Sequence, residues 1–102
     1  MRELKVVTVC GVGMGSSLIL RMNTEKALRE LGVAGKVDAI DSGQAKGVGQ
    51  RADIVVTFSH LAKSLNLGGC RVVSIVNVMD KESLKKNLAA AIEEIKESEG
   101  QR

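Results

Sequence analysis

Runs of β-branched residues alternate along this chain with segments whose apolar residues recur at helical spacing. The β-branched runs predict four strands, at residues 4–9, 36–40, 53–58 and 71–76. The second run is short and carries charged residues, which is typical of a strand at the edge of a sheet. Strands that alternate with helices predict a parallel sheet with right-handed crossovers and helices on both faces.

The two longest helical segments have defined ends. The first runs from Ser17 to about Leu31, and Gly32 is the residue expected to stop it. The last follows Asp80, whose side chain is a candidate N-cap. The apolar residues expected on the buried sides of these helices are Leu20, Ala27, Leu28 and Leu31 in the first and Leu84, Leu88, Ala91, Ile92 and Ile95 in the last.

The remaining segments are less regular. Residues 42–52 contain three glycines, which oppose a stable helix, so only a short or frayed crossover helix is expected there. A second short helix is predicted at residues 61–65, and residues 99–102 are expected to form a flexible tail. The chain, residues 1–102, is then a single α/β domain with a doubly wound, Rossmann-like sheet of strand order 2-1-3-4 between two helical layers.

Composition narrows the classes of function. Phe58 is the only Phe, Tyr or Trp residue, so the chain has no stacking platform for single-stranded nucleic acid. The net charge of +3 comes from basic residues interleaved with acidic ones, so nucleic-acid binding is not expected. The chain carries no long apolar run of the signal-peptide or membrane-spanning type, and a cytoplasmic protein is expected.

The two cysteines are expected to remain free thiols. Cys10 ends the first strand and Cys70 precedes the fourth, so they lie at opposite edges of the predicted sheet, roughly 17–20 Å apart. A disulfide needs its two Cα atoms within about 7 Å of each other. Free thiols fit the reducing cytoplasm, and Cys70 is expected to serve packing alone.

Cys10 leads directly into a loop of alternating glycines, and this segment carries the main functional signal. The glycines free the backbone to curl around an anion with its N–H groups inward, and two serines are placed to cap the next helix. N–H donors at a helix N-terminus favour the thiolate, the nucleophilic form of cysteine. The residues expected to hold phosphate are Gly11, Val12, Gly13, Met14, Gly15, Ser16 and Ser17.

Three other glycine-loop chemistries fit less well. A nucleoside triphosphatase loop needs a lysine before its hydroxyl residue, and none is present here. A dinucleotide fingerprint is matched at Gly11 and Gly13 but has Ser16 at its third glycine, although Asp38 and Asp41 stand where a ribose-binding acid belongs. A cysteine phosphatase or arsenate reductase loop has an arginine where Ser16 stands. Without that cation hydrolysis is disfavoured, and a carrier that retains the phosphoryl group is favoured.

The segment Cys-Gly-Val-Gly-Met-Gly-Ser-Ser-Leu-Ile-Leu-Arg-Met-Asn at residues 10–23 resembles the active loop and first helix of the IIB component of the bacterial sugar phosphotransferase system. The chain looks most similar to the ascorbate-type branch of the lactose/galactitol-like superfamily. The resemblance extends through residues 52–56, the Ser59-His60 pair and residues 72–79.

This resemblance implies a phosphoryl carrier. Cys10 is the counterpart of the family's phosphorylated cysteine, which accepts the group from a histidine of IIA and passes it to a sugar bound by the membrane component IIC. L-ascorbate is the implied sugar, and no cofactor or metal is expected. Relatives in the ascorbate branch often have a polar residue where Met14 stands, so mannitol- and galactitol-type specificities stay open. A cysteine-dependent phosphatase and a module that only binds phosphate or nucleotide are the alternatives from other classes.

His60 is a candidate accessory residue. It follows the third strand on the carboxyl edge that also holds Cys10, where it is in reach of the phosphoryl group or the partner histidine. A plain position at the start of a helix is the other interpretation of the same pattern.

Overall fold

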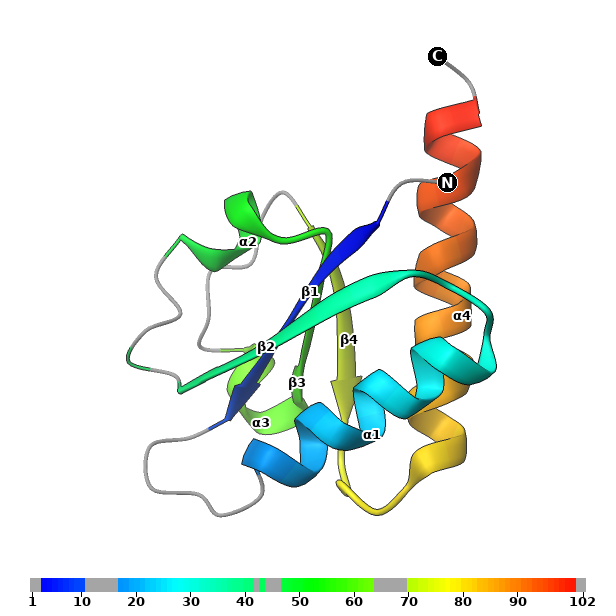
Figure 1. Ribbon diagram of the computed structural model, residues 1–102. Coiled ribbons are helices and arrows are strands. Elements are labelled where there is room, and N and C mark those ends of the chain that lie inside the picture. Colours follow the sequence, from blue (N-terminus) through cyan, green and yellow to red (C-terminus); the bar gives the residue numbers. More distant parts are fainter. Residues whose placement is uncertain (1–2, 11–16, 42, 44–46, 64–69, 101–102) are drawn as a thin grey trace.

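The architecture is a parallel sheet with helices on its faces. The computed structural model describes residues 3–10, 17–41, 43, 47–63 and 70–100. Within this part of the chain the sheet has four strands in the order β2-β1-β3-β4, which confirms the predicted order (Figure 1). The elements in chain order are β1 (Leu4–Cys10), α1 (Ser17–Glu30), β2 (Gly35–Asp41), α2 (Val48–Arg51), β3 (Ile54–Phe58), α3 (Ser59–Ala62), β4 (Arg71–Ile75) and α4 (Lys81–Gly100).

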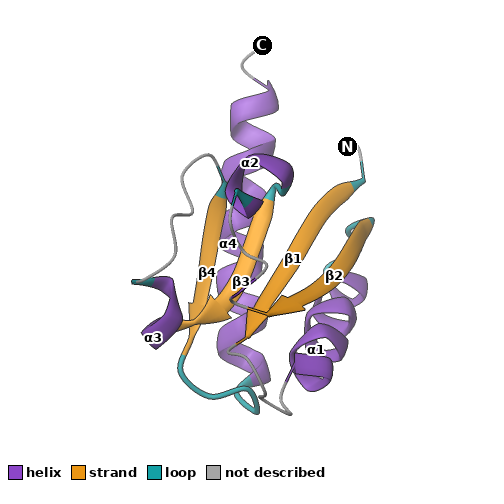
Figure 2. Ribbon diagram, turned by 90° about the vertical axis from the view of Figure 1, so that its left-hand side faces the viewer, coloured by secondary structure: helices purple, strands orange, loops and turns teal. Residues whose placement is uncertain are grey.

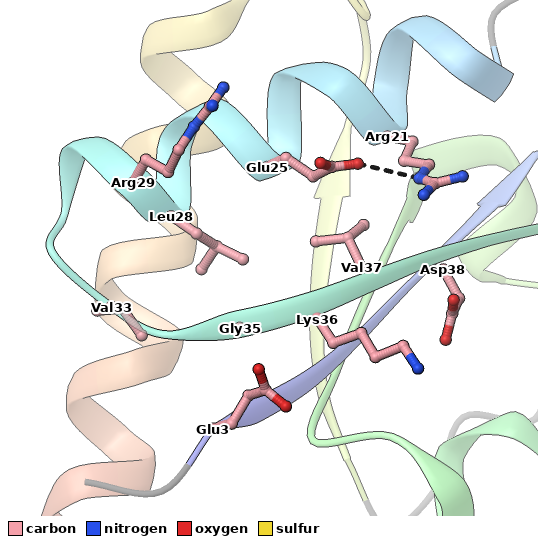
Figure 3. Close-up of a pocket in the computed structure, with 10 residues that line it drawn as sticks. All are labelled: Glu3, Arg21, Glu25, Leu28, Arg29, Val33, Gly35, Lys36, Val37 and Asp38. Atoms are coloured by element: carbon pink, nitrogen blue, oxygen red, sulfur yellow. Dashed lines mark hydrogen bonds and ion pairs between the residues drawn. The ribbon is translucent and has the colours of Figure 1, made fainter.

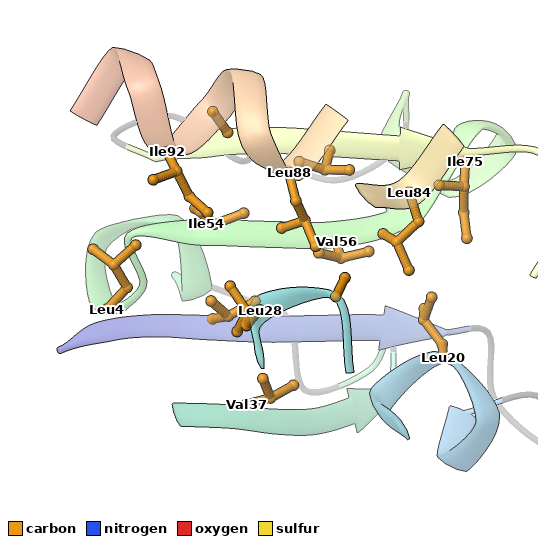
Figure 4. Packing of buried hydrophobic residues seen from close by; sticks show 14 of the residues in the cluster. Leu4, Leu20, Leu28, Val37, Ile54, Val56, Ile75, Leu84, Leu88 and Ile92 are labelled. Carbon is orange, nitrogen blue, oxygen red and sulfur yellow. The ribbon is translucent and has the colours of Figure 1, made fainter. Parts of the chain in front are cut away.

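The central strand β1 sends alternate side chains to the two faces of the sheet, as a strand must. Leu4, Val6 and Cys10 join a large apolar cluster, whereas Val7 and Val9 join a smaller one. The large cluster is covered by α1 and α4, which lie on the same face of the sheet (Figure 2). Figure 4 shows how residues from both helices pack onto the strands there.

The second face has a thinner cover. The smaller cluster consists of Val7, Val9, Val48, Ala52 and Val55, with Ile40 and Cys70 packed against it. The helix among these residues is α2, which spans only four residues. The short crossover helix predicted at residues 42–52 is therefore confirmed as α2, and it shortens because the glycine-rich segment before it disfavours helical backbone.

The end of α1 follows the glycine signal in the sequence. Gly32 has φ +69°, and its N–H donates to the Arg29 carbonyl at 3.1 Å. The Val33 N–H donates to the Leu28 carbonyl at 3.0 Å, and these two hydrogen bonds together form a Schellman motif. The motif turns the chain back into β2 at the edge of the sheet.

The start of α4 confirms Asp80 as the N-cap. Its Oδ1 accepts a hydrogen bond from the Ser83 backbone N–H at 3.1 Å. Every member of the predicted apolar stripe of this helix is buried. The helix also continues through Glu99 and Gly100, which the sequence assigns to the tail, because each residue added to a formed helix needs only one further hydrogen bond.

The position of α3 differs from the sequence prediction. The helix begins at Ser59, two residues before the predicted start at Leu61, because the pairing of β3 with β4 ends at Phe58 and Ile75. Residues 64 and 65 of the predicted helix lie outside the described residues. Among the described helices, none combines the length and apolar character needed to cross a membrane.

Candidate functional site at the carboxyl end of β1

Cys10 is the last residue of β1, and its side chain is only 1% exposed. It is paired in register with Asp41 at the end of β2, whereas the pairing of β1 with β3 stops one residue earlier, at Val9 and Thr57. Parallel sheets of this kind bind ligands beyond the carboxyl ends of their strands, at the point where the strand order reverses. Because β1 lies between β2 and β3, Cys10 occupies that point.

The loop expected to hold phosphate is only partly covered by the structure. Gly11, Val12, Gly13, Met14, Gly15 and Ser16 lie outside the described residues, so their roles remain predictions. The backbone of Ser17 opens α1, a helix of 14 residues. Its N–H groups carry partial positive charge at that end, which favours a nearby anion.

His60 lies in α3, directly after β3, and is exposed. Its ring stacks on that of Phe58, with the ring centroids 5.8 Å apart and an interplanar angle of 23°. Phe58 is buried in the same apolar cluster as Cys10. The stacking therefore anchors the imidazole at the carboxyl edge of the sheet, as predicted, whereas its contact with a phosphoryl group stays a prediction.

Cys70 lies at the other edge of the sheet, just before β4. It is partly buried against the smaller cluster, and neither it nor Cys10 forms a disulfide, which confirms the predicted free thiols. Burial raises the pKa of the Cys70 thiol, and the charge of Arg71 offsets part of that rise. A raised pKa keeps the thiol protonated and unreactive, which agrees with a packing role.

Two hydroxyl groups near the site were not predicted from the sequence. The hydroxyl of Thr57 in β3 donates to the Val9 carbonyl at 2.9 Å, and that of Ser59 donates to the Ile75 carbonyl at 3.3 Å. Each links β3 to one of its neighbouring strands at the carboxyl end. The only sequence signal for Thr57 is a hydroxyl residue within an otherwise apolar, fully buried strand.

The structure also has an open cleft, of about 360 Å³, between α1 and β2 (Figure 3). Its wall contains three basic and three acidic residues, and Arg21 forms an ion pair with Glu25 at 2.9 Å. Of the described residues that line it, none is Cys10 or His60. Balanced charges and this distance from the thiol separate the cleft from the phosphate chemistry. No group of three or more His, Cys, Asp or Glu residues suited to a metal ion occurs in the described part of the chain.

Known proteins similar to this chain share one family description. A family model for the lactose/cellobiose-specific IIB subunit of the PTS system matches residues 5–90. The chain is 34% identical over 92 residues to the ascorbate-specific PTS system EIIB component of Mycoplasma pneumoniae, covering 89% of this chain and 97% of that protein. It is 27% identical over 92 residues to the component of the same name in Salmonella typhimurium, covering 89% and 91%.

Solved structures with this fold include two IIB components. The lactose-specific IIB domain of Streptococcus pneumoniae aligns with a TM-score of 0.54 at 20% identity, covering 94% of this chain and 97% of that one. The cellobiose-specific IIB protein of Borrelia burgdorferi aligns with a TM-score of 0.54 at 18% identity, covering 88% of each chain. At these identities the alignments support the fold.

Proposed function

The chain belongs to the lactose/cellobiose-specific IIB family of the sugar phosphotransferase system, and we propose that it carries a phosphoryl group on Cys10. Cys10 accepts this group from a phosphohistidine of IIA and passes it to a sugar bound by the membrane component IIC. The observation that carries the proposal is the place of Cys10 at the carboxyl end of β1, where the chain leads into the loop before α1.

The transfer takes place in two displacements. In the first, the sulfur attacks phosphorus in line, the S–P bond forms, the P–N bond breaks, and the histidine leaves with the proton that the thiol gives up. In the second, a sugar hydroxyl oxygen attacks phosphorus, the S–P bond breaks, and the hydroxyl proton returns to the thiol. The N–H groups of residues 11–17, with the hydroxyls of Ser16 and Ser17, hold the phosphoryl oxygens in both steps.

We assign L-ascorbate as the sugar because the curated relatives with the highest identity given above are named as ascorbate-specific. The partners are then an ascorbate-type IIA and IIC, and the protein works at the cytoplasmic side of the membrane that holds IIC. His60 is an accessory residue at the same edge, where its stacked ring faces the approaching donor. The His60→Gln variant is expected to take up the phosphoryl group more slowly than the wild type.

The decisive experiment is intact mass spectrometry after incubation with phosphoenolpyruvate, the general phosphotransferase proteins and an ascorbate-type IIA. The wild type is expected to gain one phosphoryl group, and Cys10→Ser none. Cys70→Ser is the matched control, because it removes the other thiol and leaves the site intact. If the wild type gains no mass while IIA becomes phosphorylated, the assignment of this donor is wrong. Uptake by Cys10→Ser would exclude Cys10 as the acceptor.

A further inference from the structure

We propose that Thr57 is a positioning residue for Cys10, which holds the thiol in place for the phosphoryl transfer proposed above and rests on that function. Thr57 lies in β3 and is fully buried, although it carries a polar group. Its hydroxyl donates to the Val9 carbonyl at 2.9 Å, a short and well-formed hydrogen bond across the sheet. The hydroxyl thus acts directly beside the nucleophile.

The accepting atom explains why this bond matters to Cys10. The Val9 carbonyl belongs to the peptide group that joins Val9 to Cys10. The oxygen, the Cys10 nitrogen and the Cys10 Cα lie in one plane, because the peptide bond has partial double-bond character. A hydrogen bond that orients this oxygen therefore orients the backbone from which the Cys10 side chain projects.

The bond also sits where the sheet no longer restrains the chain on that side. Backbone pairing between β1 and β3 ends at Val9 and Thr57, so Cys10 has its register partner only on β2. The side chains of Thr57 and Val9 both lie on the face opposite Cys10, which turns toward the large cluster. Thr57 thus fixes the last peptide of β1 from the opposite face and leaves the thiol side open to a phosphoryl donor.

Two other hydroxyls provide matched comparisons. Ser59 makes the same kind of bond from the end of β3, but to Ile75 in β4, away from Cys10. Thr24, also fully buried, donates to the Leu20 carbonyl at 2.8 Å within α1. Ser59→Ala tests the loss of a hydroxyl link at the same end of the sheet, and Thr24→Val tests the same substitution with the same chemical loss elsewhere.

The test measures single-turnover phosphoryl transfer to Cys10 while the concentration of phosphorylated IIA is varied. Thr57→Val keeps the side-chain volume and removes the donor. Its maximal rate is expected to fall roughly tenfold or more, since small displacements of a reacting group have effects of that order. The half-saturating concentration of IIA is expected to stay unchanged. Thr57→Ser, which keeps the hydroxyl, is expected to restore most of the rate.

The outcomes separate positioning from a general structural role. Near-wild-type rates in Ser59→Ala and Thr24→Val, with a slow Thr57→Val, support the proposal. Equal slowing in all three variants, or a wild-type rate in Thr57→Val, overturns it. A rise in the half-saturating concentration with an unchanged maximal rate would also overturn it, because the defect would then lie in partner binding.

Amide hydrogen exchange at Cys10 gives a second measurement that does not depend on the relay. Exchange is expected to become roughly tenfold faster in Thr57→Val than in the wild type, and to stay unchanged in Ser59→Ala. If the wild type accepts no phosphoryl group at all, the proposed function fails. The exchange rate at Cys10 then still decides whether Thr57 holds this peptide, and an unchanged rate in Thr57→Val overturns the inference.

Discussion

The side-chain amide of Asn23 donates a hydrogen bond to the backbone carbonyl of Val78, at 3.0 Å. This bond ties α1 to the turn between β4 and α4, 55 residues further along the chain. Val78 also packs against the large apolar cluster, and Met79 donates its backbone N–H to the Asn77 side chain at 2.9 Å. The turn is therefore held against the helix that follows the cysteine loop.

Asn23→Ala is expected to lower the free energy of unfolding by about 1 kcal/mol, because the partly buried Val78 carbonyl loses its side-chain donor. Urea unfolding measures the change. Asn87→Ala is the matched control, since Asn87 is an exposed residue of α4, where alanine raises helix propensity. A loss in Asn23→Ala no larger than in Asn87→Ala would show that the bond to Val78 contributes nothing.

Asp80→Ala is expected to cost about 1 kcal/mol of stability, because the Ser83 N–H at the start of α4 loses its side-chain acceptor. Thermal unfolding monitored by circular dichroism measures the loss. Asp80→Asn keeps an acceptor oxygen and is expected to retain most of the stability. An equal loss in both variants would assign the effect to the charge at the helix N-terminus and not to the cap hydrogen bond.

Gly32→Ala is expected to destabilise the protein by about 1 kcal/mol. The positive φ of Gly32 places any Cβ in the left-handed region, where L-residues are strained, although no atom lies within 4 Å of the added Cβ. Gly32→Asn is the comparison, because asparagine tolerates this conformation better, and its unfolding midpoint is expected to fall between the other two. Wild-type stability in Gly32→Ala would contradict a strained C-terminal end of α1.

Cys70 is expected to make stability fall at alkaline pH. Burial raises the pKa of its thiol in the folded state, so the folded protein keeps a proton that the unfolded chain releases. The stabilising effect is complete below the ordinary thiol pKa of about 8.5 and is lost as pH rises through the folded value. The pH dependence of alkylation of Cys70 in Cys10→Ser is expected to have a higher midpoint in the folded than in the urea-unfolded protein.

Arg71→Gln serves as the control for this pH effect. The charge of Arg71 lowers the pKa of Cys70, so its removal is expected to move the alkylation midpoint further upward. A folded midpoint at or below that of the unfolded chain would contradict burial as the dominant cause.

Local signals account for the parts of the fold that the sequence predicted well. Gly32 marks the end of α1 and Asp80 the start of α4, since each meets a conformational or hydrogen-bonding demand within a few residues. The start of α3 was misplaced because it depends on where β3 stops pairing with β4, and that contact joins segments far apart in the chain.

The sequence by itself determined the strand order, the limits of α1, the buried stripe of α4 and the place of Cys10 at a strand end, because periodicity and turn residues act locally. Only the tertiary structure decided what surrounds that thiol. Thr57 and Val9 are 48 residues apart, as are the donor and acceptor of their hydrogen bond, and a hydroxyl in a buried strand carries no mark of the carbonyl it will meet. Side-chain to backbone bonds of this kind depend on register and on distances of a few tenths of an ångström, which arise only once the sheet is assembled.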